Sequence, residues 1–247
     1  MAVVDLAEAA PGILVLTMQD RVNKNAFTDE MTLALLDAFE TIAAEEQAKV
    51  VVLTGFDSYF STGGDQSALL RLHEGEGNFA TTSLYSLALD CRIPVISAMQ
   101  GHGIGGGFVI GLFADMVFLS RESVYTTNFM KYGFTPGMGA TYMVPLKMGT
   151  ALGHEMLMTA RNYRGEELKQ RGVPFAVLPR DQVLPEAVKA ARQLAEKPRV
   201  SLITLKDHLV AEQRRRLPEF IQAEVAMHQK TFHQDEVKEK ILSLFGR

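Results

Sequence analysis

The chain has 247 residues, of which 47% are hydrophobic and 22% charged, so it has enough apolar material to bury a large core in one or two domains. This composition excludes a disordered or fibrous protein. With 25 basic and 29 acidic residues the net charge is −4, and no overall positive field would attract nucleic acid or an anionic membrane.

The sequence shows no sign of export. Cys91 is the only cysteine, which excludes an intrachain disulfide and a cysteine-based metal cluster and is typical of a reducing compartment. Residues 1–11 lack the basic start and long apolar run of a signal peptide, and no stretch approaches the roughly 18 to 20 apolar residues of a membrane span. We therefore expect a cytoplasmic protein that spans no membrane.

A β-α-β unit is predicted near the start of the chain. Residues 12–19 form a β-rich run, and residues 49–54 form an apolar run short enough to be a buried strand. Between them, Thr28 is placed to cap a helix that has Asp29 and Glu30 in its first turn. Apolar residues continue this helix at near-helical spacing: Leu33, Leu36, Phe39 and Ile42.

A second unit of the same kind follows, with a strand at 93–99, a helix from about 105 to 113 and a strand at 115–120, so parallel pairing is expected. After Gly137 the pattern becomes mainly helical, with one short strand at 173–178. The predicted helices there span 152–159, 165–170, 181–197, 200–215 and 218–230. The sequence thus predicts a mixed α/β core followed by a helical C-terminal part.

Two glycine-rich segments could hold a negatively charged oxygen. The first, 60–66 (FSTGGDQ), follows the strand at 49–54; the second, 101–107 (GHGIGGG), follows the strand at 93–99 and opens a helix. Their glycines let a ligand approach the backbone, and N–H groups at the helix starts would point toward it. Two such turns could form an oxyanion hole, which needs two N–H donors aimed at one oxygen. The simpler interpretation is that the glycines only turn the chain.

The second segment also fits a dinucleotide-binding fingerprint, Gly101-x-Gly103-x-x-Gly106. That fingerprint normally belongs to the first β-α-β unit and needs an acidic residue at the end of the next strand, where it holds a ribose. Here the unit is the second, and its next strand ends in Ser120 and Arg121. These departures weigh against a nucleotide site.

Several motifs together resemble the crotonase (enoyl-CoA hydratase/isomerase) superfamily over essentially the whole chain: Gly-Gly-Asp at 63–65, Gly-Gly-Gly at 105–107 and TPGMGAT at 135–141. Four longer stretches are similar to the crotonase-type decarboxylases of polyketide β-branching cassettes, namely 84–91, 99–107, 125–139 and 227–233. The resemblance implies an α/β fold with a crotonase-like spiral core of β-β-α turns at 1–195. It also implies a helical trimerisation or lid region at 196–247.

In that subgroup the substrate is a 3-methylglutaconyl thioester on the phosphopantetheine arm of an acyl carrier protein, and carbon dioxide is removed without a cofactor or metal. The resemblance assigns the two oxyanion donors to the backbone amides of Gly64 and Gly106, with Gly63 and Gly105 beside them in the substrate groove. It also implies that Asn25 and Ala26 line the thioester groove. The expected assembly is a homotrimer or hexamer.

The family's hydratases carry two catalytic glutamates at positions that correspond to Val109 and Phe129 here. Neither side chain can exchange a proton, so hydration by that acid/base pair is excluded. Loss of carbon dioxide needs no base, because the charge of the resulting dienolate spreads onto the thioester oxygen in the oxyanion hole. An apolar wall that includes Val109 and Phe129 would favour this step by destabilising the substrate carboxylate.

The proton donor of the subgroup corresponds to His228. Taken alone, a histidine on an apolar helix is more often a packed residue; the resemblance favours the catalytic role, and an ordinary pKa near 6.5 suits it. His233, five residues on, would point elsewhere, which disfavours a metal pair with His228. His102 could line the pocket or brace the glycine-rich segment.

A lysine that the subgroup carries after the first oxyanion turn is missing, and its position falls at or near Asn78. Three consequences are open: a slower enzyme, replacement of the lysine by His73 or Arg71, or a different protonation site. We favour the third, with a proton delivered to C2 of the dienolate and a β,γ-unsaturated product. Two other functions also remain open, an enoyl-thioester isomerase and a catalytically idle thioester-binding subunit.

Overall fold

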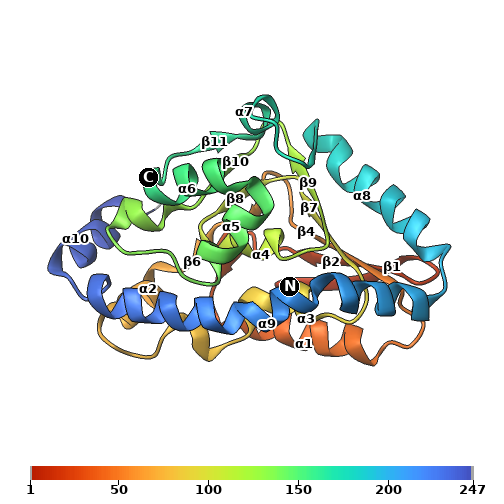
Figure 1. The fold of residues 1–247 in the computed structure, drawn as a ribbon, viewed down its shortest axis with the longest axis horizontal. Helices are drawn as coiled ribbons and strands as arrows, with labels where there is room; N and C mark the ends of the chain where they lie inside the picture. Colours follow the sequence, from red (N-terminus) through yellow and green to blue (C-terminus); the bar gives the residue numbers. More distant parts are fainter. Residues whose placement is uncertain (1, 246–247) are drawn as a thin grey trace.

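The structure is a computed structural model that describes residues 2–245 (Figure 1). Its main sheet has six strands, of which the first is antiparallel to its neighbour and the remaining five run parallel. In spatial order the strands are β1 (Val4–Ala10), β2 (Ile13–Met18), β4 (Val50–Thr54), β7 (Val95–Met99), β9 (Met116–Ser120) and β12 (Ala176–Leu178). The two predicted parallel units, β2 to β4 and β7 to β9, are confirmed.

Two smaller sheets were not predicted. Their strands are two or three residues long, too short to show an alternating pattern in the sequence. The four-stranded sheet has the order β11 (Tyr163–Arg164), β10 (Val124–Thr126), β8 (His102–Ile104) and β5 (Tyr59–Ser61). The two-stranded sheet pairs β3 (Ala26–Phe27) with β6 (Gly63–Gly64).

The α-helices cover both faces of the main sheet, with α8 on one side and α1 and α3 on the other (Figure 1). They are α1 (Asp29–Ala44), α2 (Gln66–His73), α3 (Leu87–Asp90), α4 (Gly106–Leu112), α5 (Ala140–Met148), α6 (Thr150–Thr159), α7 (Gly165–Gln170), α8 (Arg180–Ala195), α9 (Arg199–Thr231) and α10 (Asp235–Leu244). Residues 2–245 also contain three 3₁₀ turns: η1 (Phe79–Thr81), η2 (Leu84–Ser86) and η3 (Asn128–Tyr132).

Burial on both faces explains why β4 is a continuous apolar run. Val50 and Val52 pack in a cluster with α8, whereas Val51 and Leu53 belong to the larger core on the opposite face. A parallel strand between two helical layers has no solvent side and therefore no polar positions. The predicted cap of α1 is confirmed, since Thr28 Oγ1 accepts a hydrogen bond from the Met31 N–H at 3.1 Å.

The C-terminal helices differ from the prediction in two ways, since α10 was not predicted and α9 is continuous. Residues 199–231 form a single helix, α9, where two helices at 200–215 and 218–230 were predicted. Pro218 cannot donate to the preceding turn, but buried Leu217 and Ile221 on either side of it keep the helix anchored to the core. The proposed boundary between the regions 1–195 and 196–247 falls between α8 and α9. Residue 1 of the first region and residues 246–247 of the second lie outside the described residues.

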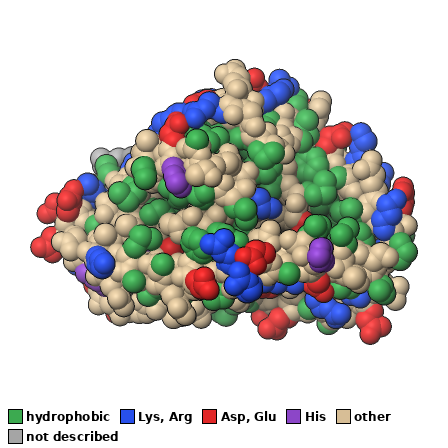
Figure 2. All heavy atoms as spheres, viewed as in Figure 1, with side chains coloured by type: hydrophobic (Ala, Val, Ile, Leu, Met, Phe, Trp, Pro, Cys, Tyr) green, Lys and Arg blue, Asp and Glu red, His purple; other side chains and the backbone are tan. Residues whose placement is uncertain are grey.

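The exposed side of α9 carries mixed charges, as Figure 2 shows along the lower part of the molecule. Ion pairs within the helix, Arg214 with Asp207 and Arg215 with Glu212, belong to this surface. Within residues 2–245 no helix is both long enough and apolar enough to cross a membrane.

Candidate active site

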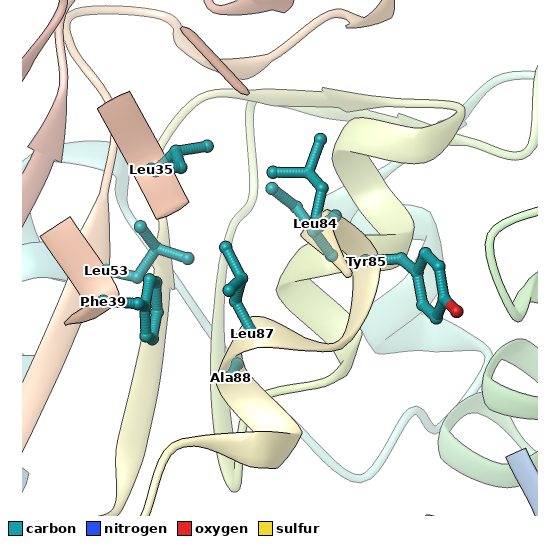
Figure 3. Close-up of a pocket in the computed structure, with 8 residues that line it drawn as sticks. Leu35, Phe39, Leu53, Leu84, Tyr85, Leu87 and Ala88 are labelled. Atoms are coloured by element: carbon teal, nitrogen blue, oxygen red, sulfur yellow. The ribbon is translucent and has the colours of Figure 1, made fainter. Parts of the chain in front are cut away.

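One large cavity, of about 720 Å³, lies where both glycine-rich segments meet the end of α9. Its volume is in the usual range for sites that bury a small-molecule ligand. A second cavity, of about 10 Å³, lies among apolar side chains of α1, β4 and the η2–α3 segment and is too small for a substrate (Figure 3). The predicted site residues that line the large cavity are Ala26, Gly64, Asn78, Gly105, Gly106, Phe129 and His228.

The first glycine-rich segment is held in place by Asn25. The Asn25 side chain is fully buried, and its Nδ2 donates to the carbonyls of Met18 and Phe60 at 3.0 and 2.9 Å. Its Oδ1 accepts from the Asp20 N–H at 2.8 Å. Asn25 is not a lining residue, whereas its neighbour Ala26 is. The structure therefore places Asn25 behind the groove, where it fixes the backbone that lines it.

Gly63 brings the two glycine-rich segments into contact. Its φ of +77° favours glycine, and a Cβ at this position would lie 3.1 and 3.2 Å from the amide nitrogens of Gly107 and Gly106. The same Cβ would also overlap the carbonyl oxygen of Ile104. Gly63 does not itself line the cavity, but its lack of a side chain lets Gly64 and Gly106 reach the same cavity from different segments.

The second segment is not a simple loop. Strand β8 occupies residues 102–104, inside the segment, and α4 begins only at Gly106. Gly106 is the first residue of α4, and first-turn N–H groups have no acceptor within their own helix. The strand, tight turn and helix that a dinucleotide fingerprint requires are therefore not formed by Gly101, Gly103 and Gly106, which removes the nucleotide interpretation.

His102 braces the second segment. Its Nδ1 accepts a hydrogen bond from the Val124 N–H at 2.9 Å, across the β8–β10 pair. A ring nitrogen that accepts is unprotonated, and burial together with nearby Arg180 and Arg164 lowers the pKa of His102. His102 is not a lining residue of the cavity. Of the two roles left open by the sequence, the geometry favours bracing.

Aromatic side chains form the apolar wall. Phe129 lines the cavity as predicted, whereas Val109 is fully buried inside α4 and does not line it. Other phenylalanines that line the cavity were not identified from the sequence, and three of them surround His228: Phe79, Phe134 and Phe232. They come from η1, from the segment after η3 and from the C-terminal end of α9, which the sequence gives no reason to bring together.

His228 lies in this aromatic wall. Its ring centroid is 5.0 Å from that of Phe79, 5.1 Å from Phe232 and 5.8 Å from Phe134. His228 Nε2 is 2.7 Å from the carbonyl oxygen of Thr135. Because a carbonyl only accepts, Nε2 carries a proton and Nδ1 is the ring atom that takes up and releases the second one.

Partial burial disfavours the charged form of this ring. It lowers the pKa of His228, while hydrogen bonding to the backbone of Thr135 and Pro136 acts in the opposite direction. The placement follows from the periodicity of α9, since His228 continues the buried stripe of Leu217, Ile221 and Glu224 by one turn. A half-buried ring whose charged form is destabilised is well suited to give up a proton.

Asn78, at the position of the missing lysine, is exposed and lines the cavity. Its Oδ1 accepts from the Ala80 N–H at 2.9 Å and so caps η1. This bond engages the acceptor oxygen of the side chain and leaves its Nδ2 hydrogens as the groups that can reach a substrate.

The two residues considered as substitutes for the lysine differ in position. Arg71 lines the cavity, and its Nη2 is 3.2 Å from a carboxylate oxygen of Asp29. His73 does not line it, and its Nε2 is 3.2 Å from the Gln234 carbonyl at the junction of α9 and α10. Arg71 is therefore the better placed of the two.

Three acidic residues of the described chain line the cavity, Asp29, Asp65 and Glu76, and Asp29 pairs with Arg71. Asp65 lines the cavity but caps α2, accepting from the Ala68 N–H at 3.1 Å. Among residues 2–245 no group of three or more His, Cys, Asp or Glu side chains is placed to hold a metal ion. Beside the two oxyanion segments, the site thus presents backbone amides, an aromatic wall and the half-buried His228.

Comparison with known proteins agrees with the resemblance drawn from the sequence. The pattern of the family described as "Enoyl-CoA hydratase/isomerase" matches residues 8–245. The chain is 60% identical over 245 residues to bacillaene synthase decarboxylase PksI of Bacillus subtilis (strain 168), covering 99% of this chain and 98% of that protein.

Two solved structures are similar over nearly their full length. One comes from work on a dehydratase/decarboxylase enzyme couple involved in polyketide β-branching; it shares 60% identity, with a TM-score of 0.98, over 99% of this chain and 100% of that one. The other is the ECH2 decarboxylase domain of CurF from Lyngbya majuscula, with 44% identity and a TM-score of 0.95 over the same shares of the two chains.

Proposed function

The chain belongs to the enoyl-CoA hydratase/isomerase family, as a decarboxylase of that superfamily, and we propose that it removes carbon dioxide from a 3-methylglutaconyl thioester carried by an acyl carrier protein in polyketide β-branching. The observation that carries this proposal is the meeting of Gly64, Gly106 and His228 at one cavity whose wall contains Phe129. This set can stabilise an enolate and deliver a proton, but it has no carboxylate at the positions where a hydratase needs one.

The reaction breaks the bond between C4 of the acyl group and its carboxylate. The electron pair of that bond enters the conjugated system, carbon dioxide leaves, and the negative charge of the dienolate rests largely on the thioester oxygen. The amides of Gly64 and Gly106 are the proposed donors to that oxygen, and removing one such donor in other enzymes costs about 100- to 1,000-fold in rate. The phenyl ring of Phe129 disfavours the charged carboxylate relative to the more diffuse dienolate.

His228 then supplies the proton that completes the product. Its Nε2–H stays bonded to the Thr135 carbonyl, so the proton that moves is the one on Nδ1. Protonation at C4 gives the α,β-unsaturated thioester, and protonation at C2 gives the β,γ isomer. The exposed Asn78, which cannot hold the carboxylate as a lysine would, supports our proposal that the β,γ isomer forms.

The phosphopantetheine arm is proposed to lie along the β3–β6 pair. Ala26 pairs with Gly63, and Asn23, Lys24 and Ala26 line the cavity beside Gly64. The arm's amides could bond to this backbone. Exposed apolar side chains on α9 (Val200, Leu205 and Leu209) support the further prediction that 196–247 contributes to a homotrimer or hexamer interface.

The proposed activity is tested by mass spectrometry of the intact acyl carrier protein. Incubation of the purified enzyme with the 3-methylglutaconyl carrier protein should lower the acyl mass by one carbon dioxide. A mass that stays unchanged while the double bond moves would instead identify an isomerase. If neither the mass nor the double bond changes, the chain is an idle thioester-binding subunit.

Substitution of Asn78 tests the product assignment. We expect Asn78→Lys to shift the product toward the α,β isomer, because a fixed cation would hold the carboxylate and turn C4 toward the acid. The substitution also removes the cap of η1, which in helices is worth about 0.5–2 kcal/mol, so Asn78→Ala is the matched control. Chromatography of the released acids measures the ratio of the α,β to the β,γ isomer. If both wild type and Asn78→Lys give only the α,β isomer, the proposed β,γ product is wrong.

A further inference from the structure

Glu224 is a buried carboxylate that the mechanism above does not use. Its residue has 0% relative exposure, on the stripe of α9 that faces the core. Glu224 Oε2 accepts from the Gly139 N–H at 2.7 Å, and Oε1 accepts from the Thr141 N–H at 2.8 Å and from Thr141 Oγ1 at 2.6 Å. Three donors around one buried carboxylate form a site built for a negative charge.

These donors belong to the start of α5. Gly139 is the N-cap of that helix and has no side chain to cap it, so Glu224 from α9 takes over the capping role. A carboxylate at this end of a helix also interacts favourably with the helix dipole. Burial raises the pKa of Glu224, whereas the bonds from Thr141 and Gly139 favour the ionised form. Burial and the charges of Asp90 and Glu224 in turn raise the pKa of Tyr85.

The segment that Glu224 caps, residues 135–141, contacts both His228 and the oxyanion segment that contains Gly106. At its beginning, the Thr135 carbonyl holds the His228 ring, and a Cβ at Gly137 would lie 3.0 Å from His228 Cε1. Further along, Met138 lies against the oxyanion segment, since a Cβ at Gly106 would be 2.5 Å from the Met138 sulfur. Met138 has a φ of +63°, which a non-glycine residue keeps only when its surroundings hold it.

We propose that Glu224 is a positioning residue that fixes the proton donor relative to the oxyanion hole by locking residues 135–141 onto α9. Glu224 and His228 are one helical turn apart, so α9 is fastened to this segment twice, once through the Glu224 carboxylate and once through the His228 ring. The catalytic consequence rests on the proposed function of His228, whereas the structural link between the two side chains does not.

The test uses Glu224→Gln, with Glu219→Gln as the matched control on the exposed side of the same helix. The introduced amide would keep the volume of the Glu224 side chain but turn its NH₂ toward an N–H donor. Histidine labelled with ¹³C at Cε1 reports the ring state of each of the six histidines, and His228→Gln identifies the His228 signal. We expect Glu224→Gln to shift the His228 signal and its titration midpoint, and to lower kcat by about ten- to a hundred-fold with little change in KM. Glu219→Gln should leave all three unchanged.

The outcomes separate this inference from the proposed function. A His228 signal and midpoint that are unchanged in folded Glu224→Gln overturn the positioning role, even if the wild type releases carbon dioxide. A shifted signal in an enzyme whose wild type releases none supports the positioning role and rejects the proposed function. If Glu224→Gln does not fold, Thr141→Val removes a single donor and is judged by the same His228 signal, with a smaller shift expected.

Discussion

Replacing His228 with alanine should lower product formation by about a hundred-fold or more, the usual contribution of a positioned general acid. The dienolate would then depend on water for its proton, in a cavity whose wall at this point is formed by three phenylalanines. The measurement is single-turnover conversion of the 3-methylglutaconyl carrier protein, quenched and analysed as intact mass. Because the donor also decides which carbon is protonated, the isomer ratio should change together with the rate.

Loss of the ring could also act through packing, so His228→Gln is the matched control. Its amide keeps the size of the side chain and can still donate to the Thr135 carbonyl, but it cannot release a proton. We expect both variants to be slow, with the glutamine variant close to the wild type in thermal stability. Burial lowers the pKa of His228 from 6.5, so the protonated ring disappears as pH rises through the lowered value. The wild-type rate should therefore also fall as pH rises. A His228→Gln rate close to that of the wild type would contradict the role of His228 as the acid.

Gly63→Ala should lower the rate of decarboxylation by more than a substitution that only removes a side-chain contact. At a φ of +77°, an alanine costs about 1–2 kcal/mol by itself, and its Cβ would in addition overlap the Ile104 carbonyl. Because the overlapping atom belongs to the backbone, the overlap can be relieved only if the backbone moves. The other backbone atoms close to this Cβ are the amide nitrogens of Gly106 and Gly107. Displacement of one oxyanion donor corresponds to a rate loss of about 100- to 1,000-fold.

Gly172→Ala separates backbone strain from displacement. Gly172 has nearly the same φ, +76°, but a Cβ there would meet no atom within 4 Å. We expect it to lose stability in thermal unfolding while keeping its turnover number. If Gly63→Ala were folded and as active as Gly172→Ala, the contact between the two glycine-rich segments would not support catalysis.

Prediction from the sequence succeeded where a pattern extends over many residues. The parallel strands β2, β4, β7 and β9 and the helix α1 follow from apolar runs, helical spacing and the Thr28 cap, because secondary structure of that length leaves a period in the sequence. Prediction failed for β8, whose three residues were taken for a loop between glycines. It failed again at Pro218, where packing of Leu217 and Ile221 outweighed the proline.

Some residues of the candidate site could be predicted from the sequence, and others could not. Gly64, Gly106, Phe129 and His228 could be selected from their motifs, and the structure brings all four to one cavity. Val109 and Asn25 could also be selected, but nothing in a motif tells a lining residue from one buried just behind the wall.

By itself, the sequence determined the succession of strands and helices, the glycines that permit close backbone approach and the chemical types available for catalysis. Only the tertiary structure decided that Phe79 packs on His228 and that Glu224 caps α5, because these partners lie far apart in the chain. Periodicity and local motifs record which face of an element is buried. They do not record which distant element covers that face, since that depends on the packing of the whole chain.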